Sequence, residues 1–148
     1  MKMTQIKWFM VLALFAFAIG ICNTIKQNKG DKKYFDELNL KLTGIVESVD
    51  LSYIPNGFGV AKVSIINSNR HYYDPRDDHE YYYCLIKNGK AEIYQSGLYE
   101  CAIGDTINVN TRKRIFLIKN GVKEDIEDIV LSTYDKFYNY VRKNHQKF

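Results

Sequence analysis

The first feature of the chain is an apolar segment near its start. Residues 8–22 carry no charged side chain, and two lysines precede them. As a helix these residues would span about 22 Å, against roughly 30 Å for the hydrocarbon core of a bilayer, so their flanks would have to extend the span. A basic start followed by an apolar run is typical of an export signal or a membrane anchor. We therefore expect an N-terminal hydrophobic helix in residues 1–25, with membrane contact through residues 6–25.

Two fates are open for this segment, because its length fits both an anchor and a cleaved signal. Small side chains at Ala18 and Gly20 would suit a signal peptidase, whereas Ile21 is large for the position before a lipidated Cys22. Four lysines follow the segment and argue against export, but a short basic start is the usual entry signal. We expect a membrane-anchored protein with an extracytoplasmic domain. Secretion after cleavage near Ala18 or Gly20 is the alternative.

Alternating apolar and polar positions predict strands in the next part of the chain. The alternation over residues 38–49 indicates a first strand, and Gly44 interrupts it where a β-bulge or bend would fit. A turn signal at residues 55–57 precedes a second strand over residues 60–66. A further pair of strands is expected over residues 106–109 and 114–118.

The sharpest turn signal is the dipeptide Asn88-Gly89. Both residue types tolerate positive φ, which a two-residue type I′ turn requires. Strand-like residues flank the dipeptide at 81–86 and 91–94. The sequence therefore predicts a tight hairpin here.

The spacing of apolar residues changes near the end of the chain. From Glu124 onward they recur every three or four positions, which predicts an amphipathic helix over about residues 124–143. The sequence Ser-Thr-Tyr-Asp at 132–135 leaves an alternative open, because it could cap a shorter helix that follows a strand. The expected fold is mainly β with a C-terminal α-helix, built as a small antiparallel barrel or a strongly curled sheet.

Composition limits the function classes. Hydrophobic residues make up 46% of the chain and charged residues 26%, which excludes a disordered tail. Residues 26–33 are polar, as in a flexible tether, and leave residues 34–148 for a single domain, too short for a two-domain enzyme. The net charge of +4 is too small for a nucleic-acid footprint, so we expect no nucleic-acid partner.

The loop at residues 71–80 holds two of the three histidines and four carboxylates. These groups could bind a divalent cation, but neither an EF-hand nor an HExxH spacing is present. The sequence Asp-Pro-Arg-Asp-Asp is also typical of a solvated turn, and we favour that interpretation. No metal and no cofactor are expected.

Tyrosines surround the same loop, and their rings could stack on sugars or bases. Tyrosine is also a preferred strand residue, so packing in the core is the alternative that we favour. If the rings do bind a ligand, the candidate binding residues are Tyr72, Tyr73, His79, Tyr81 and Tyr83.

Two cysteines, Cys84 and Cys101, lie in the expected domain. In an oxidising compartment we expect them to form a disulfide, and two buried thiols are the alternative. The sequence shows no nucleophile elbow and no glycine-rich phosphate loop. We therefore assign no catalytic residue.

Three short motifs carry a resemblance to known proteins. They are Leu-Thr-Gly-Ile-Val at residues 42–46, Ser-Gly-Leu-Tyr at 96–99 and Ile-Gly-Asp-Thr-Ile at 103–107. Together with the N-terminal apolar segment, they resemble a group of small, uncharacterised bacterial exported or membrane-anchored proteins. The resemblance implies a compact β-barrel of the oligonucleotide/oligosaccharide-binding type over residues 42–118. It implies no catalytic residues, and the acidic loop at 72–80 and the C-terminal helix depart from it.

These patterns favour a noncatalytic binding or interaction module at the cell envelope. Its partner would be an envelope protein or a glycan. Two alternatives are a small hydrolase or nuclease on a barrel scaffold, and an anchored immunity-type protein that neutralises a toxin. An enzyme would need a pocket with converging histidine or carboxylate groups, whereas a binder needs an exposed complementary surface.

Overall fold

The computed structural model describes residues 3–51, 58–121 and 123–146. The chain divides into two compact units, Met1–Tyr34 and Phe35–Phe148. We describe each unit by itself. The expected turn at residues 55–57 lies outside the described residues.

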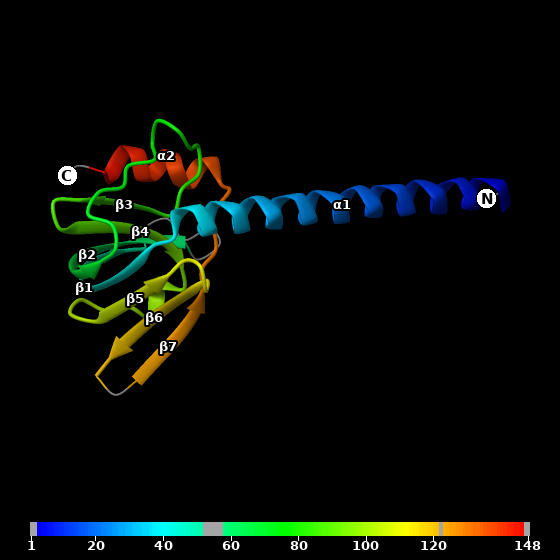
Figure 1. Cartoon of the computed structure of the whole chain (residues 1–148). Coiled ribbons are helices and arrows are strands. Elements are labelled where there is room, and N and C mark those ends of the chain that lie inside the picture. Colours follow the sequence, from blue (N-terminus) through cyan, green and yellow to red (C-terminus); the bar gives the residue numbers. More distant parts are fainter. Residues whose placement is uncertain (1–2, 52–57, 122, 147–148) are drawn as a thin grey trace. The chain divides into compact units, whose positions relative to one another are not determined.

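The first unit consists of helix. Helix α1 (Met3–Leu38) continues through residues 26–33, so the segment expected to be a flexible tether is helical (Figure 1). Large apolar side chains such as Trp8, Phe15 and Phe17 are exposed on it. Among the described residues, no helix has both the length and the apolar character needed to cross a membrane.

The second unit is built around one antiparallel sheet, as the alternating pattern predicts. The described residues form seven strands in the spatial order β3-β4-β2-β1-β5-β6-β7 (Figure 1). Their bounds are β1 Lys41–Asp50, β2 Phe58–Ser68, β3 Cys84–Lys87, β4 Lys90–Ser96, β5 Thr106–Asn110, β6 Ile115–Asn120 and β7 Lys123–Asp128. The predominantly β fold with a C-terminal helix is therefore confirmed.

The sheet is open, so of the two expected forms, a small antiparallel barrel and a strongly curled sheet, the closed barrel is wrong. Strands β3 and β7 stand at opposite ends of the strand order and do not pair within the described part of the chain. The outer edge of β3 is instead occupied by the preceding loop, because Tyr73 and Ile86 exchange backbone hydrogen bonds of 2.9 and 2.8 Å. At the far ends of β4 and β7, Gln95 donates from Nε2 to the backbone oxygen of Asp128 at 2.9 Å. A side chain of β4, the strand next to β3, thus binds β7 where no backbone ladder joins the two strands.

One face of the sheet forms the core, and we call it the inner face. Alternate residues of β1, β5 and β6 point into it, as the buried Leu42, Val109 and Phe116 show. Phe35 and Leu38, at the end of α1, are also buried. The opposite side is called the outer face below. In β1, β5 and β6, burial of one face and exposure of the other is what the period of two in the sequence predicts.

Two local predictions are confirmed. The register between β1 and β2 shifts between Thr43 and Gly44, so the glycine does mark a bulge or irregularity. Asn88 and Gly89 have φ values of 54° and 73° and connect the paired residues Lys87 and Lys90 of β3 and β4. This is the expected tight hairpin.

The long C-terminal helix over residues 124–143 is wrong in its first half. Residues 124–128 belong to β7, residues 129–134 lie in neither a strand nor a helix, and helix α2 covers only Asp135–Asn144. The reason is cross-strand packing, since Ile126 pairs with Leu117 of β6 and β7 adds six residue pairs to the ladder. The alternative of a strand followed by a shorter helix is therefore the correct one, although the N-cap residue, Tyr134, makes no side-chain capping bond.

Helix α2 packs through aromatic rings against the half of the sheet that contains β2 and β4. The ring of Phe137 lies 5.6 Å from that of Phe58 and 6.4 Å from that of Tyr94. The hydroxyl of Tyr138 donates to the backbone oxygen of Tyr82 at 2.6 Å. The helix therefore covers one part of the outer face and leaves the part on β1, β5 and β6 uncovered by these contacts.

Candidate functional site

The uncovered part of the outer face holds a groove of about 490 Å³. Its walls come from the end of β2, the start of β1, the end of β5 and the start of β6. Lining residues are Lys41, Leu42, Thr43, Asn67, Ser68, Asn69, Asn108, Val109, Asn110, Lys113, Ile115 and Leu117. Eight of these twelve residues carry an amide, a hydroxyl or an ammonium group, four are apolar, and none is acidic.

The strand register explains why these side chains meet. Thr43 of β1 pairs with Asn67 of β2 on one side and with Asn108 of β5 on the other, and Asn108 pairs in turn with Leu117 of β6. Residues paired across neighbouring strands point to the same face. The four side chains therefore form a continuous row, three polar and one apolar, across the groove.

A second row marks the end of the groove next to the turn between β5 and β6. Lys41 pairs with Asn110, and Asn110 pairs with Ile115. The turn follows directly, and the backbone N–H of Lys113 donates to Oδ1 of Asn110 at 3.2 Å. Two lysines therefore lie at the same end of the groove.

Internal hydrogen bonds hold several of the groove amides in place. Thr43 donates from Oγ1 to Oδ1 of Asn108 at 2.7 Å. Asn69 accepts from the backbone N–H of Lys41 at 2.7 Å and donates to the backbone oxygen of Asn39 at 2.7 Å. These bonds fix the orientation of the amides before any ligand arrives, which reduces the entropy lost on binding.

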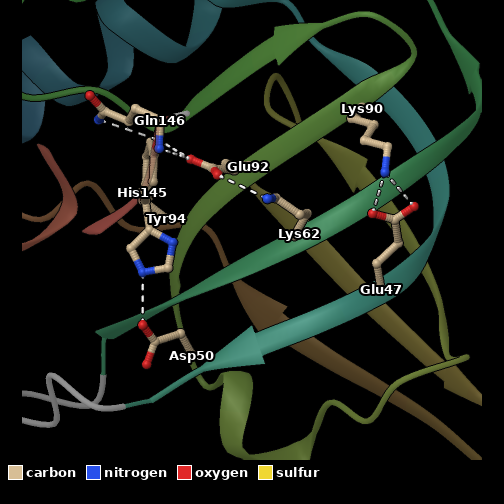
Figure 2. A network of polar contacts seen from close by, with 8 residues as sticks. All are labelled: Glu47, Asp50, Lys62, Lys90, Glu92, Tyr94, His145 and Gln146. Atoms are coloured by element: carbon tan, nitrogen blue, oxygen red, sulfur yellow. Dashed lines mark hydrogen bonds and ion pairs between the residues drawn. The ribbon is translucent and has the colours of Figure 1, made fainter. Parts of the chain in front are cut away.

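A second polar cluster lies on β1, β2 and β4 beside α2, and Figure 2 shows it. At its centre, Glu92 is only 1% exposed. Its carboxylate lies 3.8 Å from Nζ of Lys62, and it accepts hydrogen bonds from the Tyr94 hydroxyl at 3.2 Å and from the backbone N–H of Gln146 at 2.9 Å. Burial and the adjacent Glu92 raise the pKa of Tyr94 well above its usual value. The buried carboxylate is thus compensated by its neighbours, as a buried charge must be.

The same cluster contains a histidine–carboxylate pair. Nε2 of His145 lies 2.7 Å from Oδ2 of Asp50, and the hydroxyl of Tyr140 donates to the same oxygen at 2.6 Å. A catalytic pair of this kind would need a nucleophile bonded to the imidazole. No serine, threonine or cysteine of the described residues is hydrogen-bonded to His145. The pair connects the end of α2 to β1.

On the β1–β2 side, Glu47 accepts from Ser64 at 2.6 Å and pairs with Lys90 at 2.9 Å. The hydrogen bond from Ser64 and the ammonium of Lys90 lower the pKa of the Glu47 carboxyl. The carboxylates of this cluster are therefore occupied by internal partners.

The loop at residues 71–80 shows no metal-binding geometry. Within the part of the chain that the structure describes, no group of three histidine, cysteine or acidic residues comes together. Asp74 is bound by the guanidinium of Arg76, which lowers the pKa of that carboxyl. His71, Asp77 and His79 are exposed.

The candidate tyrosines do not form one surface. Tyr72 is 63% exposed, whereas Tyr83 is fully buried, so the inclusion of Tyr83 in a ligand surface is wrong. Tyr73 is half-buried and bonds the backbone of Ile86 at the edge of β3. Tyr81 donates to Asp135 of α2 at 2.5 Å, and this hydrogen bond raises the pKa of the phenol to about 12. Alternation does not apply to residues 81–83, because β3 begins only at Cys84.

The two cysteines are free thiols in the structure. Cys84 is buried in β3, whereas Cys101 follows the short 3₁₀ helix η2 (Leu98–Glu100), and the turn after it docks on β1 through Val46. In the sheet order, β4 and β2 lie between β3 and β1. Burial raises the pKa of both thiols, that of Cys101 to about 11. The alternative of a buried thiol therefore describes Cys84.

The groove was missed in the sequence because its residues are ordinary polar side chains far apart along the chain. Asn67, Asn108 and Asn110 occupy alternate polar positions that read as the solvent side of strands. A signal was present in the repeated choice of asparagine, a residue depleted in strands.

Comparison of the chain with protein-family models, with curated proteins and with solved structures gives no match. The geometry of the chain alone therefore carries the functional argument.

Proposed function

We propose that the domain is a noncatalytic binding module whose groove on the outer face holds a glycan. The single observation that carries this proposal is the row of Asn67, Thr43, Asn108 and Leu117 across three neighbouring strand pairs. Amide and hydroxyl groups match the hydroxyls of a sugar, and an apolar side chain matches the C–H face of its ring. The groove residues are held by a rigid sheet, which favours binding.

The enzyme alternative has less support. The buried Glu92 accepts from the backbone N–H of Gln146 and lies beside the ammonium of Lys62. Asp50 is paired with His145. These groups are therefore occupied by partners within the domain. The groove itself contains neither a histidine nor a carboxylate. A hydrolytic mechanism would require such groups at the ligand.

A binding assay tests the glycan proposal. Screening the full chain against soluble oligosaccharides and peptidoglycan fragments is expected to identify a ligand, and Asn108→Ala is expected to weaken it about fivefold, the effect of one lost hydrogen bond. Asn139→Ala, an exposed asparagine of α2 outside the groove, is the matched control and leaves affinity unchanged. The proposal fails if no oligosaccharide binds, or if Asn108→Ala and Asn139→Ala have equal effects.

The proposed location is the cell envelope, with residues 6–25 in contact with the membrane and the domain outside the cytoplasm. The basic start and the uncharged residues 8–22 support it. Secretion after cleavage near Ala18 or Gly20 is the alternative form. A reporter that works only after export, fused after Phe148, is expected to be active. Activity of a cytoplasmic reporter alone would reverse the orientation, as the lysines after the apolar segment would favour.

A further inference from the structure

Two amides of the groove, those of Asn108 and Asn110, present an open donor group. Oδ1 of Asn108 accepts from Thr43, and Oδ1 of Asn110 accepts from the backbone N–H of Lys113. The Nδ2 groups of both asparagines have no acceptor within the described residues. Because Asn108 and Asn110 use their Oδ1 atoms internally and keep Nδ2 open, these two amides fit a ligand that offers acceptor oxygens.

The two groove lysines differ from most other lysines of the strands, Lys87 of β3 being the exception. Four lysines of the strands lie within ion-pair distance of a carboxylate: Lys62, Lys90, Lys119 and Lys123. Lys41 and Lys113 have no such partner among the residues that the structure describes. The carboxylate of Asp128 belongs to β7, whose residue 128 pairs with Ile115, so the apolar Ile115 separates it by register from Asn110 and Lys41. Positive charge at this end of the groove is therefore available to a ligand.

We infer that the ligand of the groove is an acidic oligosaccharide, and that Lys41 and Lys113 bind its carboxylate or phosphate groups. The inference rests on the proposed function and names the ligand class for the same site. Asn110 lies between the two lysines by register and turn contact, and its Nδ2 donates to the same anionic group. Charge-assisted hydrogen bonds of this kind are stronger than neutral ones. The row of Thr43 and Asn108 holds the neighbouring sugar unit.

Matched probes separate charge from sugar recognition. Oligogalacturonate and its methyl ester share one backbone and differ in charge, and a phosphorylated maltooligosaccharide with its dephosphorylated form provides the same comparison for phosphate. We expect one charged probe to bind at least about tenfold more tightly than its neutral form, with an affinity that falls as salt rises. The probe pair that shows this difference in affinity identifies the bound anionic group as a carboxylate or a phosphate.

Substitutions locate the effect. Lys41→Gln and Lys113→Gln are each expected to weaken the charged probe about tenfold and the neutral probe by less than about twofold. Lys136→Gln, at an exposed position of α2, changes net charge equally and is the control. Asn108→Ala weakens both probes, because it removes a contact to the sugar.

Several outcomes overturn the inference. Equal binding of charged and neutral probes, with Lys41→Gln and Lys113→Gln silent, rejects the acidic ligand but leaves the glycan site, because Asn108→Ala still acts. Binding of neither form rejects the glycan site itself. Lysine-dependent binding of single-stranded DNA or of phosphatidylglycerol vesicles, without binding of any acidic oligosaccharide, assigns the groove to another anion.

Discussion

Replacing Phe137 by alanine is expected to lower the free energy of unfolding by about 4 kcal/mol and Tm by roughly 15 °C. The ring is 1% exposed and contacts the rings of Phe58, Tyr94 and Tyr138. Alanine removes these contacts and leaves a cavity between α2 and the sheet, which backbone shifts fill only in part. Thermal and urea unfolding of the full chain measure the change.

Tyr134→Ala is the matched control, because this tyrosine begins the same helix but is 51% exposed. A loss of less than about 1 kcal/mol is expected for it. Similar unfolding curves for Phe137→Ala and the unchanged chain would mean that α2 does not pack on the sheet as described.

Gly44→Ala is expected to destabilise the domain by about 2 kcal/mol, a typical cost of overpacking. A Cβ at this position would lie 2.6 Å from the backbone oxygen of Ser64 and would also collide with Cγ1 of Val63. Ser64 pairs with Ile45 in the ladder, so its carbonyl cannot move without disturbing β2. Gly44→Val should cost more, because it adds further atoms to the same space.

The control for this substitution is Gly30→Ala. No atom lies within 4 Å of a Cβ built at Gly30, which is part of α1. Alanine favours the helix over glycine, so the helix content of the variant is expected to be equal or higher by circular dichroism. A neutral Gly44→Ala would show that the bulge in β1 has room for a side chain.

Local signals made part of the fold predictable from sequence. The Asn88-Gly89 hairpin depends on the φ values of two adjacent residues, and the irregularity at Gly44 on one glycine within an alternating run. Such features are encoded within a few positions, and their physical cause is the allowed backbone conformation of those residues.

Features that depend on distant contacts were not predictable. The helical spacing begins at Glu124, but residues 124–128 form part of β7, which is stabilised by pairing with β6, and this pairing is not visible in one segment alone. Closure of the sheet depends on how β3 and β7 are placed, which is a property of the whole chain. The groove depends on the register of four strands, so the unusual asparagines in the strands could be noticed in the sequence but could not be assigned to a common site.

The open edge at β7 affects how copies of this domain meet. An unpaired strand edge can accept a strand from another molecule and so start aggregation. Four of the six residues of β7 are acidic, namely Glu124, Asp125, Glu127 and Asp128. Glu124 and Asp125 are paired with Lys119 and Lys123, so a second copy approaching with the same edge would bring mainly its own Glu127 and Asp128 against the same carboxylates here. Like charges placed opposite each other destabilise a strand pair. The acidic edge thus protects the open sheet from self-association, a protection that a closed barrel would obtain from its geometry alone.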